Sequence, residues 1–255
     1  PHFANTFSVS RNFKQMERIN TEEIKSWIAP YLTVNGNTPE VPIILKETNI
    51  LKYFQELTLP NIFEEYAIIL HSFWIYNLTE NQIERLNLKG KELINSEPEF
   101  PENGYNPISW FDFYKFKKVD FDLKTAIKNS VDWKFPFVQM NNELYPGEGI
   151  IDNKHLSEIS NLILKYYGDQ EIEIYYIFLA TNNWEEDKMF KGKITELIKL
   201  IENEETVRTP SLIYSTEKNW ALNSDYDLQF SIIGGNKEFI NELIEKNPKE
   251  IYQIS

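Results

Sequence analysis

Cysteine is absent from this chain of 255 residues, and glycine and histidine are scarce, with 9 and 3 copies. Without cysteine there are no disulfides, no Cys-ligated zinc, no iron–sulfur cluster and no thiol nucleophile. The sequence also lacks the G-x-G-x-x-G, G-K-[S/T] and G-x-S-x-G motifs. It has no apolar run of the roughly 18 residues that a membrane-spanning helix requires. These absences predict a protein without a cofactor.

The charge balance is strongly acidic. Asp and Glu number 39 against 26 Lys and Arg, so the formal net charge is −13. Such a surface repels phosphate groups and anionic lipids, and we therefore expect no nucleic-acid partner and no membrane partner. It would attract a basic protein partner and accelerate the encounter with it. An acidic balance also serves solubility alone, and the charge does not choose between these two interpretations.

The residue bias and the N-terminus bear on source and location. The chain has 22 Lys but 4 Arg, together with abundant Ile and Asn, as expected for an AT-rich bacterial genome. It begins Pro1-His2-Phe3, which is neither an initiator Met nor the start of a signal peptide. We expect a cytoplasmic location. A trimmed chain and a processed one would begin alike.

The hydrophobic content of 42% and aromatic content of 15% predict a globular protein. Residues 1–97 are predicted to be mostly helical, because capping boxes begin at Asn20 and Thr79 and the apolar segments 48–57 and 62–76 contain no proline. Residues 71–76 are aromatic enough to form a strand instead. Prolines and glycine at 98–107 mark a boundary, and 98–150 is predicted to be an aromatic- and proline-rich connecting segment.

Residues 151–255 show the clearest pattern, although one continuous domain for the whole chain is an open alternative. Strands are expected at 171–181, 211–215, 227–233 and 251–254, and 220–222 extends between two of them. Helices are expected after Asn183 and after Asn236. The order is β-α-β-β-α-β. The prediction is an α+β fold in which a helical N-terminal part precedes a mixed or antiparallel sheet with helices on one side.

Candidate catalytic residues are few. His71 lies among apolar residues, which is typical of a hydrogen-bonded core histidine. His155-x-x-Glu158 places two ligand types on one helix face, with Asp152 just before, but this is a weak metal signal. Gly234-Gly235 between a strand and a helix predicts a tight turn. Asp225-x-Asp227 can bind a cation in an extended segment, yet aspartate is also common in ordinary turns that enter strands.

Aromatic residues cluster between 110 and 137. Most of them should be core, but aromatics in acid-flanked, loop-rich segments also suit protein-binding surfaces. Near the C-terminus, the segment from Trp220 through Asp225-Tyr226-Asp227 and Phe230 to Gly234-Gly235 resembles acidic bacterial proteins of the toxin-immunity type. This resemblance covers a small part of the chain and implies no particular functional residue.

Two classes of function follow. The first is a non-catalytic acidic binding module, best interpreted as a bacterial immunity protein that neutralises a basic toxin. The alternative is a carboxylate-based hydrolase or transferase, which can be metal-dependent and would use Asp225, Asp227 and Glu148. A purely structural subunit is a third possibility. The partner-binding residues predicted by the first hypothesis are Trp110, Asp112, Tyr114, Glu143, Glu148, Asp225 and Asp227.

Overall fold

The computed structural model describes residues 16–32, 39–76, 105–181, 184–197 and 209–255. Its centre is an eight-stranded sheet of order β1-β7-β6-β8-β9-β10-β2-β11, and a separate three-stranded sheet has the order β4-β3-β5. Among the described residues, the neighbouring strands in both sheets pair antiparallel. The α+β prediction is therefore confirmed.

The elements have the following bounds. The large sheet contains β1 (Glu17–Ile19), β2 (Glu65–Leu70), β6 (Glu171–Tyr176), β7 (Lys188–Lys193), β8 (Leu212–Ser215), β9 (Ala221–Asn223), β10 (Phe230–Gly235) and β11 (Ile251–Gln253). The small sheet contains β3 (Phe73–Tyr76), β4 (Tyr105–Ile108) and β5 (Glu143–Leu144). The α-helices are α1 (Ile43–Thr48), α2 (Ile50–Thr58), α4 (Trp110–Phe116), α5 (Leu123–Val131), α6 (Asn153–Tyr167) and α8 (Lys237–Lys246).

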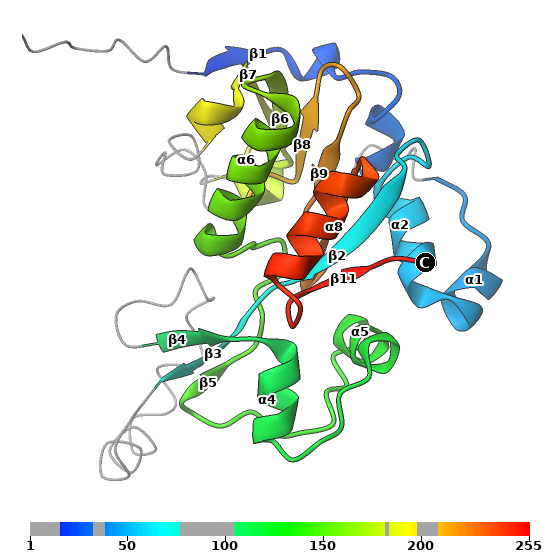
Figure 1. Cartoon of the computed structure of the whole chain (residues 1–255), viewed down its shortest axis with the longest axis vertical. Coiled ribbons are helices and arrows are strands. Elements are labelled where there is room, and N and C mark those ends of the chain that lie inside the picture. Colours follow the sequence, from blue (N-terminus) through cyan, green and yellow to red (C-terminus); the bar gives the residue numbers. More distant parts are fainter. Residues whose placement is uncertain (1–15, 33–38, 77–104, 182–183, 198–208) are drawn as a thin grey trace, which may run out of the picture.

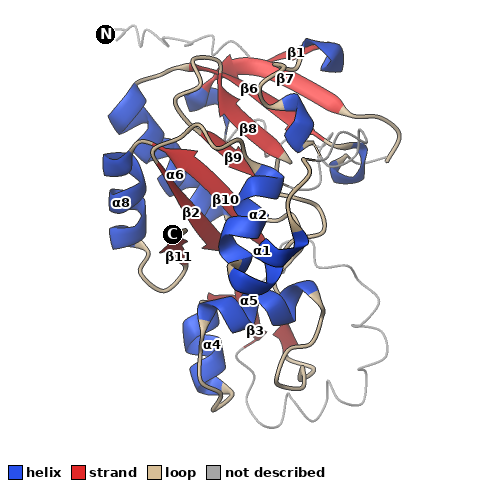
Figure 2. Ribbon diagram, turned by 90° about the vertical axis from the view of Figure 1, so that its right-hand side faces the viewer, coloured by secondary structure: helices blue, strands red, loops and turns tan. Residues whose placement is uncertain are grey.

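Helices cover both faces of the large sheet (Figure 2). On one face α6 and α8 pack their apolar sides against alternate residues of the strands, such as Ile69, Ile174 and Ile233. On the other face α2 packs against the residues between them, such as Ile68 and Ile232. The prediction of helices on one side thus describes only the α6 and α8 layer. Strands buried on both faces read as continuous apolar runs, as 67–70 does.

The small sheet and helices α4 and α5 form a unit at one end of the large sheet (Figure 1). The chain enters this unit where β2 ends and β3 begins, at His71 and Ser72. Its core is aromatic: the ring of Phe73 stacks on Phe113 with 4.0 Å between centroids and contacts Trp110 edge-on. Most of the aromatic residues between 110 and 137 are buried or partly buried, as predicted.

The predicted C-terminal strands β6, β8, β9, β10 and β11 are all present, and Asn236 caps α8 by accepting a hydrogen bond from the backbone N–H of Phe239. The helix expected after Asn183 does not begin there, because residues 188–196 form strand β7 and a short 3-10 helix, Ile194–Glu196. Leu197 is helical, and residues 198–208 lie outside the described part of the chain. Sheet pairing on both sides, with β1 and β6, outweighs the helical spacing of the apolar residues here.

Strand β7 therefore takes the place of the first part of the first helix in the β-α-β-β-α-β order. The second half of that pattern is present, because β10, α8 and β11 form a crossover unit with β2 inserted between the two strands. Strand β2 comes from the N-terminal part of the chain, so residues 1–97 and 151–255 share one sheet.

Three further expectations can be compared with the structure. Residues 62–76 are not helical, since they contain β2 and β3, and the alternative of a strand at 71–76 is the correct one for β3. The capping box at Asn20 is present but opens a single turn of 3-10 helix, Thr21–Glu23. The helix predicted from Thr79 and most of the boundary at 98–107 lie outside the described residues.

Gly234 and Gly235 do not form a turn. They end β10, and a Cβ added at Gly234 would lie 2.4 Å from the ring of Phe63. Glycine is needed there for the close approach of an aromatic ring.

Within the part of the chain that the structure describes, no helix has both the length and the apolar character to cross a membrane.

Candidate functional site

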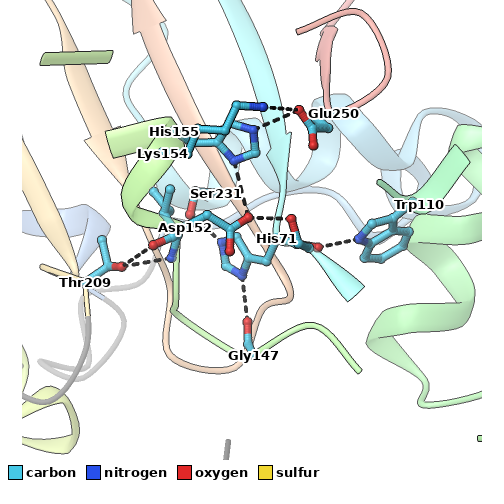
Figure 3. A network of polar contacts seen from close by, with 11 residues as sticks. His71, Trp110, Gly147, Asp152, Lys154, His155, Thr209, Ser231 and Glu250 are labelled. Atoms are coloured by element: carbon cyan, nitrogen blue, oxygen red, sulfur yellow. Dashed lines mark hydrogen bonds and ion pairs between the residues drawn. The ribbon is translucent and has the colours of Figure 1, made fainter. Parts of the chain in front are cut away.

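Buried polar side chains gather where β2 ends and α6 begins (Figure 3). His71 and Ser72 follow β2, Asp152 immediately precedes α6, and His155 lies in the first turn of that helix. Ser231 lies on β10 beside them. All five side chains belong to residues that are at most 6% exposed. A polar cluster inside the core requires internal partners, since unpaired buried polar groups are costly.

His71 is a neutral, fully bonded histidine. Its Nδ1 lies 2.7 Å from the carbonyl oxygen of Gly147, which can only accept, so Nδ1 carries the proton. Nε2 then accepts from the hydroxyl of Ser231 at 2.8 Å. Burial lowers the pKa of His71 to about 4. The expectation of a hydrogen-bonded core histidine is confirmed.

His155, unlike His71, carries a positive charge. Its Nε2 lies 3.0 Å from Glu250 and its Nδ1 lies 3.4 Å from Asp152. Burial alone would lower the pKa of His155, but the two carboxylates outweigh it and raise the pKa to about 9. The ring is therefore an imidazolium at neutral pH. Asp152 also accepts a hydrogen bond from Ser72 at 2.5 Å, and Glu250 lies 3.7 Å from Lys154.

The cluster joins elements that are distant in sequence. The indole Nε1 of Trp110 on α4 donates to the backbone carbonyl of His71 at 2.6 Å, which attaches the small unit to the end of β2. The hydroxyl of Thr209 accepts from the backbone N–H of Ile151 at 2.8 Å. Through Glu250 the cluster also reaches the connection between α8 and β11.

The buried histidines of this cluster bond to other groups of the protein, which indicates a structural role. Ser231 and His71 have the spacing of a nucleophile and its base, but both are 1% exposed and lie inside the core. His155 contacts Asp152, which the sequence pattern includes, and Glu250, which the sequence does not suggest. Among the described residues, no group of three or more histidine and carboxylate side chains could hold a metal ion.

Three of the predicted partner-binding residues are inside the protein. Trp110 and Tyr114 are 0% and 2% exposed and form part of the aromatic core. Glu143 is 2% exposed, and its carboxylate binds the ammonium of Lys117 at 2.6 Å. It also accepts from the backbone N–H of Met140. All three side chains are therefore part of the interior of the small unit: Trp110 and Tyr114 lie on α4, and Glu143 begins β5.

Asp112 lies at the surface in the first turn of α4. Both of its carboxylate oxygens lie 2.9 Å from the ammonium of Lys249, and the hydroxyl of Ser109 donates to it. These contacts, chiefly that with Lys249, lower the pKa of Asp112. The residue therefore connects α4 to the chain that leads into β11.

The remaining predicted acids come together from two loops. Gly149 follows Glu148 in a turn, and its backbone N–H donates to the carbonyl of Leu228 at 2.9 Å. A Cβ added at Gly149 would lie 3.1 Å from the Cα of Tyr226. This close approach, with φ at +63°, explains why glycine is present there. Glu148 is thereby held next to the turn between β9 and β10.

That turn has the ordinary backbone role considered for its aspartates. The carboxylate of Asp225 accepts from the backbone N–H of Asp227 at 2.9 Å, which is the pattern of an Asx turn. Asp225 is partly exposed and Asp227 is exposed. The structure thus holds the residue after Glu148 against the turn that carries Asp225 and Asp227.

One exposed aromatic residue was not predicted. Trp184, between β6 and β7, is 55% exposed and has a φ of +53°, a conformation that costs energy for a non-glycine residue. Exposed Glu185 and Glu186 follow it. No signal in the sequence separates this tryptophan from those that are buried, because its exposure depends on the turn between two strands.

Neither a protein-family model, nor a curated protein, nor a solved structure matches this chain.

Proposed function

We propose that this protein is a non-catalytic binding module for a basic protein partner, and that it acts as a cytoplasmic bacterial immunity protein whose partner is a basic toxin. The observation that carries the proposal is the Gly149–Leu228 hydrogen bond, which holds the residue after Glu148 against the turn of Asp225 and Asp227. On this proposal, acids separated by more than 70 residues in the sequence form one acidic surface. The net charge of −13 supports the same polarity for the partner.

Trp184 supports recognition of a protein. The ends of β6 and β9 and the starts of β8 and β10 lie at the same end of the large sheet, so the loop of Trp184 and the turn of Asp225 both emerge there. Tryptophan is enriched among the residues that dominate binding energy, and acids around it supply steering and a polar rim. Backbone strain also clusters at functional positions.

A carboxylate-based hydrolase finds less support. Its nominated residues, Glu148, Asp225 and Asp227, lie on turns at the surface, and no metal-binding group of carboxylates occurs among the described residues. The buried histidines are bonded to other protein groups. General acid–base catalysis needs a group within reach of the substrate.

The experiment is affinity capture from a bacterial lysate with the intact protein and two triple variants. The test variant is E148Q/D225N/D227N, and the control is E40Q/E47Q/E245Q, which changes the net charge equally at exposed positions elsewhere. We expect one basic protein in stoichiometric amount with the wild type and the control, and its loss with the test variant. Equal recovery by both variants, or recovery of no basic protein, would contradict the proposal.

A further inference from the structure

The loop of Glu148 and the turn of Asp225 and Asp227 are both connected to the buried side chain of His71. The ring of His71 bonds through Nδ1 to the carbonyl of Gly147, the residue before Glu148. Through Nε2 it bonds to Ser231, whose hydroxyl oxygen lies 2.8 Å from that of Ser224, the residue before Asp225. Each arm of the imidazole therefore ends one residue from a predicted partner-binding acid.

We infer that His71 is the positioning residue that fixes Glu148 relative to Asp225 and so gives the acidic surface its shape. This inference rests on the proposed function. An imidazole suits the task because its two nitrogens are held at a fixed separation by a rigid ring, whereas two flexible side chains would let the loops move independently. Binding surfaces gain affinity when their geometry is set before the partner arrives.

The ring is itself held in place. The backbone N–H of His71 donates to the carbonyl of Gln229 at 3.2 Å, and its carbonyl accepts from Trp110 at 2.6 Å. The side chain is 1% exposed, so water does not compete for its hydrogen bonds. A hydrogen bond from the backbone N–H of Gly149 to the carbonyl of Leu228 also joins the two loops, without His71.

The neutral state of the His71 ring matches the groups that surround it. The groups that face it are the carbonyl of Gly147, the hydroxyl of Ser231, and, at longer range, the Asp152 carboxylate and the His155 imidazolium. A neutral ring donates at one nitrogen and accepts at the other, which matches a carbonyl on one side and a hydroxyl on the other. It also adds no positive charge behind the acidic surface.

The test compares H71N, H71Q and H71L in the full chain. The amide of asparagine lies near the position of Nδ1 and can donate to Gly147, and that of glutamine lies near Nε2 and can bond Ser231. The first measurement is hydrogen exchange at the backbone amides of Gly149 and Ser224, which bond Leu228 and Ser211. We expect faster exchange at Gly149 in H71Q and H71L, and near wild-type exchange in H71N.

The second measurement is binding of a deca-lysine peptide at low salt. We expect H71L to bind about tenfold more weakly, the scale of one lost charge-assisted contact, and H71N to recover most of the loss. The outcome that overturns the inference is wild-type exchange and affinity in H71L, or no difference between H71N and H71L. If H71L does not fold, the comparison of H71N with H71Q decides, since both keep a polar group.

The two failures are distinguishable. If deca-lysine binds the E148Q/D225N/D227N variant as tightly as the wild type, the acidic surface is not the binding site and the proposed function fails. If that variant binds weakly while the His71 variants do not differ, the proposed function stands and the role of His71 fails.

Discussion

The imidazolium of His155 and the carboxylate of Glu250 lie 3.0 Å apart although 95 positions separate them in the sequence. Asp152 lies on the other side of the ring. One cation is therefore shared by two largely buried carboxylates, which joins the start of α6 to the connection between α8 and β11.

Replacing His155 by glutamine should destabilise the protein strongly. Two carboxylates would then face each other without a cation, and loss of one member of a buried pair costs about 3–5 kcal/mol. Urea unfolding measures the change in free energy. The control is K154Q: Lys154 lies 3.7 Å from the same Glu250 carboxylate, but its side chain is 70% exposed, so less than about 1 kcal/mol should be lost. Equal losses would contradict the account.

His155 should also make stability depend on alkaline pH. Its pKa is raised from 6.5 to about 9 in the folded protein. The stabilisation is therefore fully present below pH 6.5 and is lost as the pH rises through about 9. The wild type should lose about 3 kcal/mol over this range relative to H155Q. Parallel stability curves for the two proteins between pH 6 and 9.5 would be inconsistent with an imidazolium at this position.

His71 should make the free energy of unfolding depend on acidic pH, with stability falling as the pH falls. Its pKa is lowered to about 4, so between pH 6.5 and 4 the unfolded chain binds a proton that the folded protein does not. Stability should fall as the pH drops through this window. In H71N the fall should be smaller by about 3 kcal/mol. Denaturant unfolding at pH 6.5 and pH 4 measures the difference, and an equal fall in both proteins would count against a neutral His71.

The histidine sites show where sequence reasoning reaches its limit. A proline-free apolar segment predicted α2, a capping residue predicted α8 and apolar patterns predicted several strands, because these signals act over a few residues. The approach of Glu250 to His155, and of Ser231 to His71, depends on how distant strands pair. Likewise β7 carries helix-like spacing but is held in the sheet by pairing on both sides.

The same limit explains the acids. Aspartate and glutamate are so numerous in this chain that no spacing identifies a cluster. Glu148 and Asp225 are neighbours only because Gly149 lets two backbones approach closely. Burial of Glu143 depends on its ion pair with Lys117, 26 residues earlier, and local sequence does not reveal it.

Two helices end with residues that glycine would suit better. Lys118 after α4 and Trp133 after α5 have φ values of +59° and +52°, in the helix-ending pattern that usually contains glycine. K118G should raise the free energy of unfolding by about 0.5–1 kcal/mol. The matched control K115G, inside α4, should lower it by about 1 kcal/mol. A loss of stability in K118G would show that the lysine side chain matters there.

The central claim is that Glu148, Asp225 and Asp227 form the surface that captures a basic partner. The most direct measurement is the association rate constant with the captured protein at two salt concentrations, for the wild type, E148Q/D225N/D227N and E40Q/E47Q/E245Q. We predict a rate that falls with salt in the wild type and the control, and a slower rate with a weaker salt dependence in the test variant. Equal rates and equal salt dependence in the two triple variants would contradict the claim.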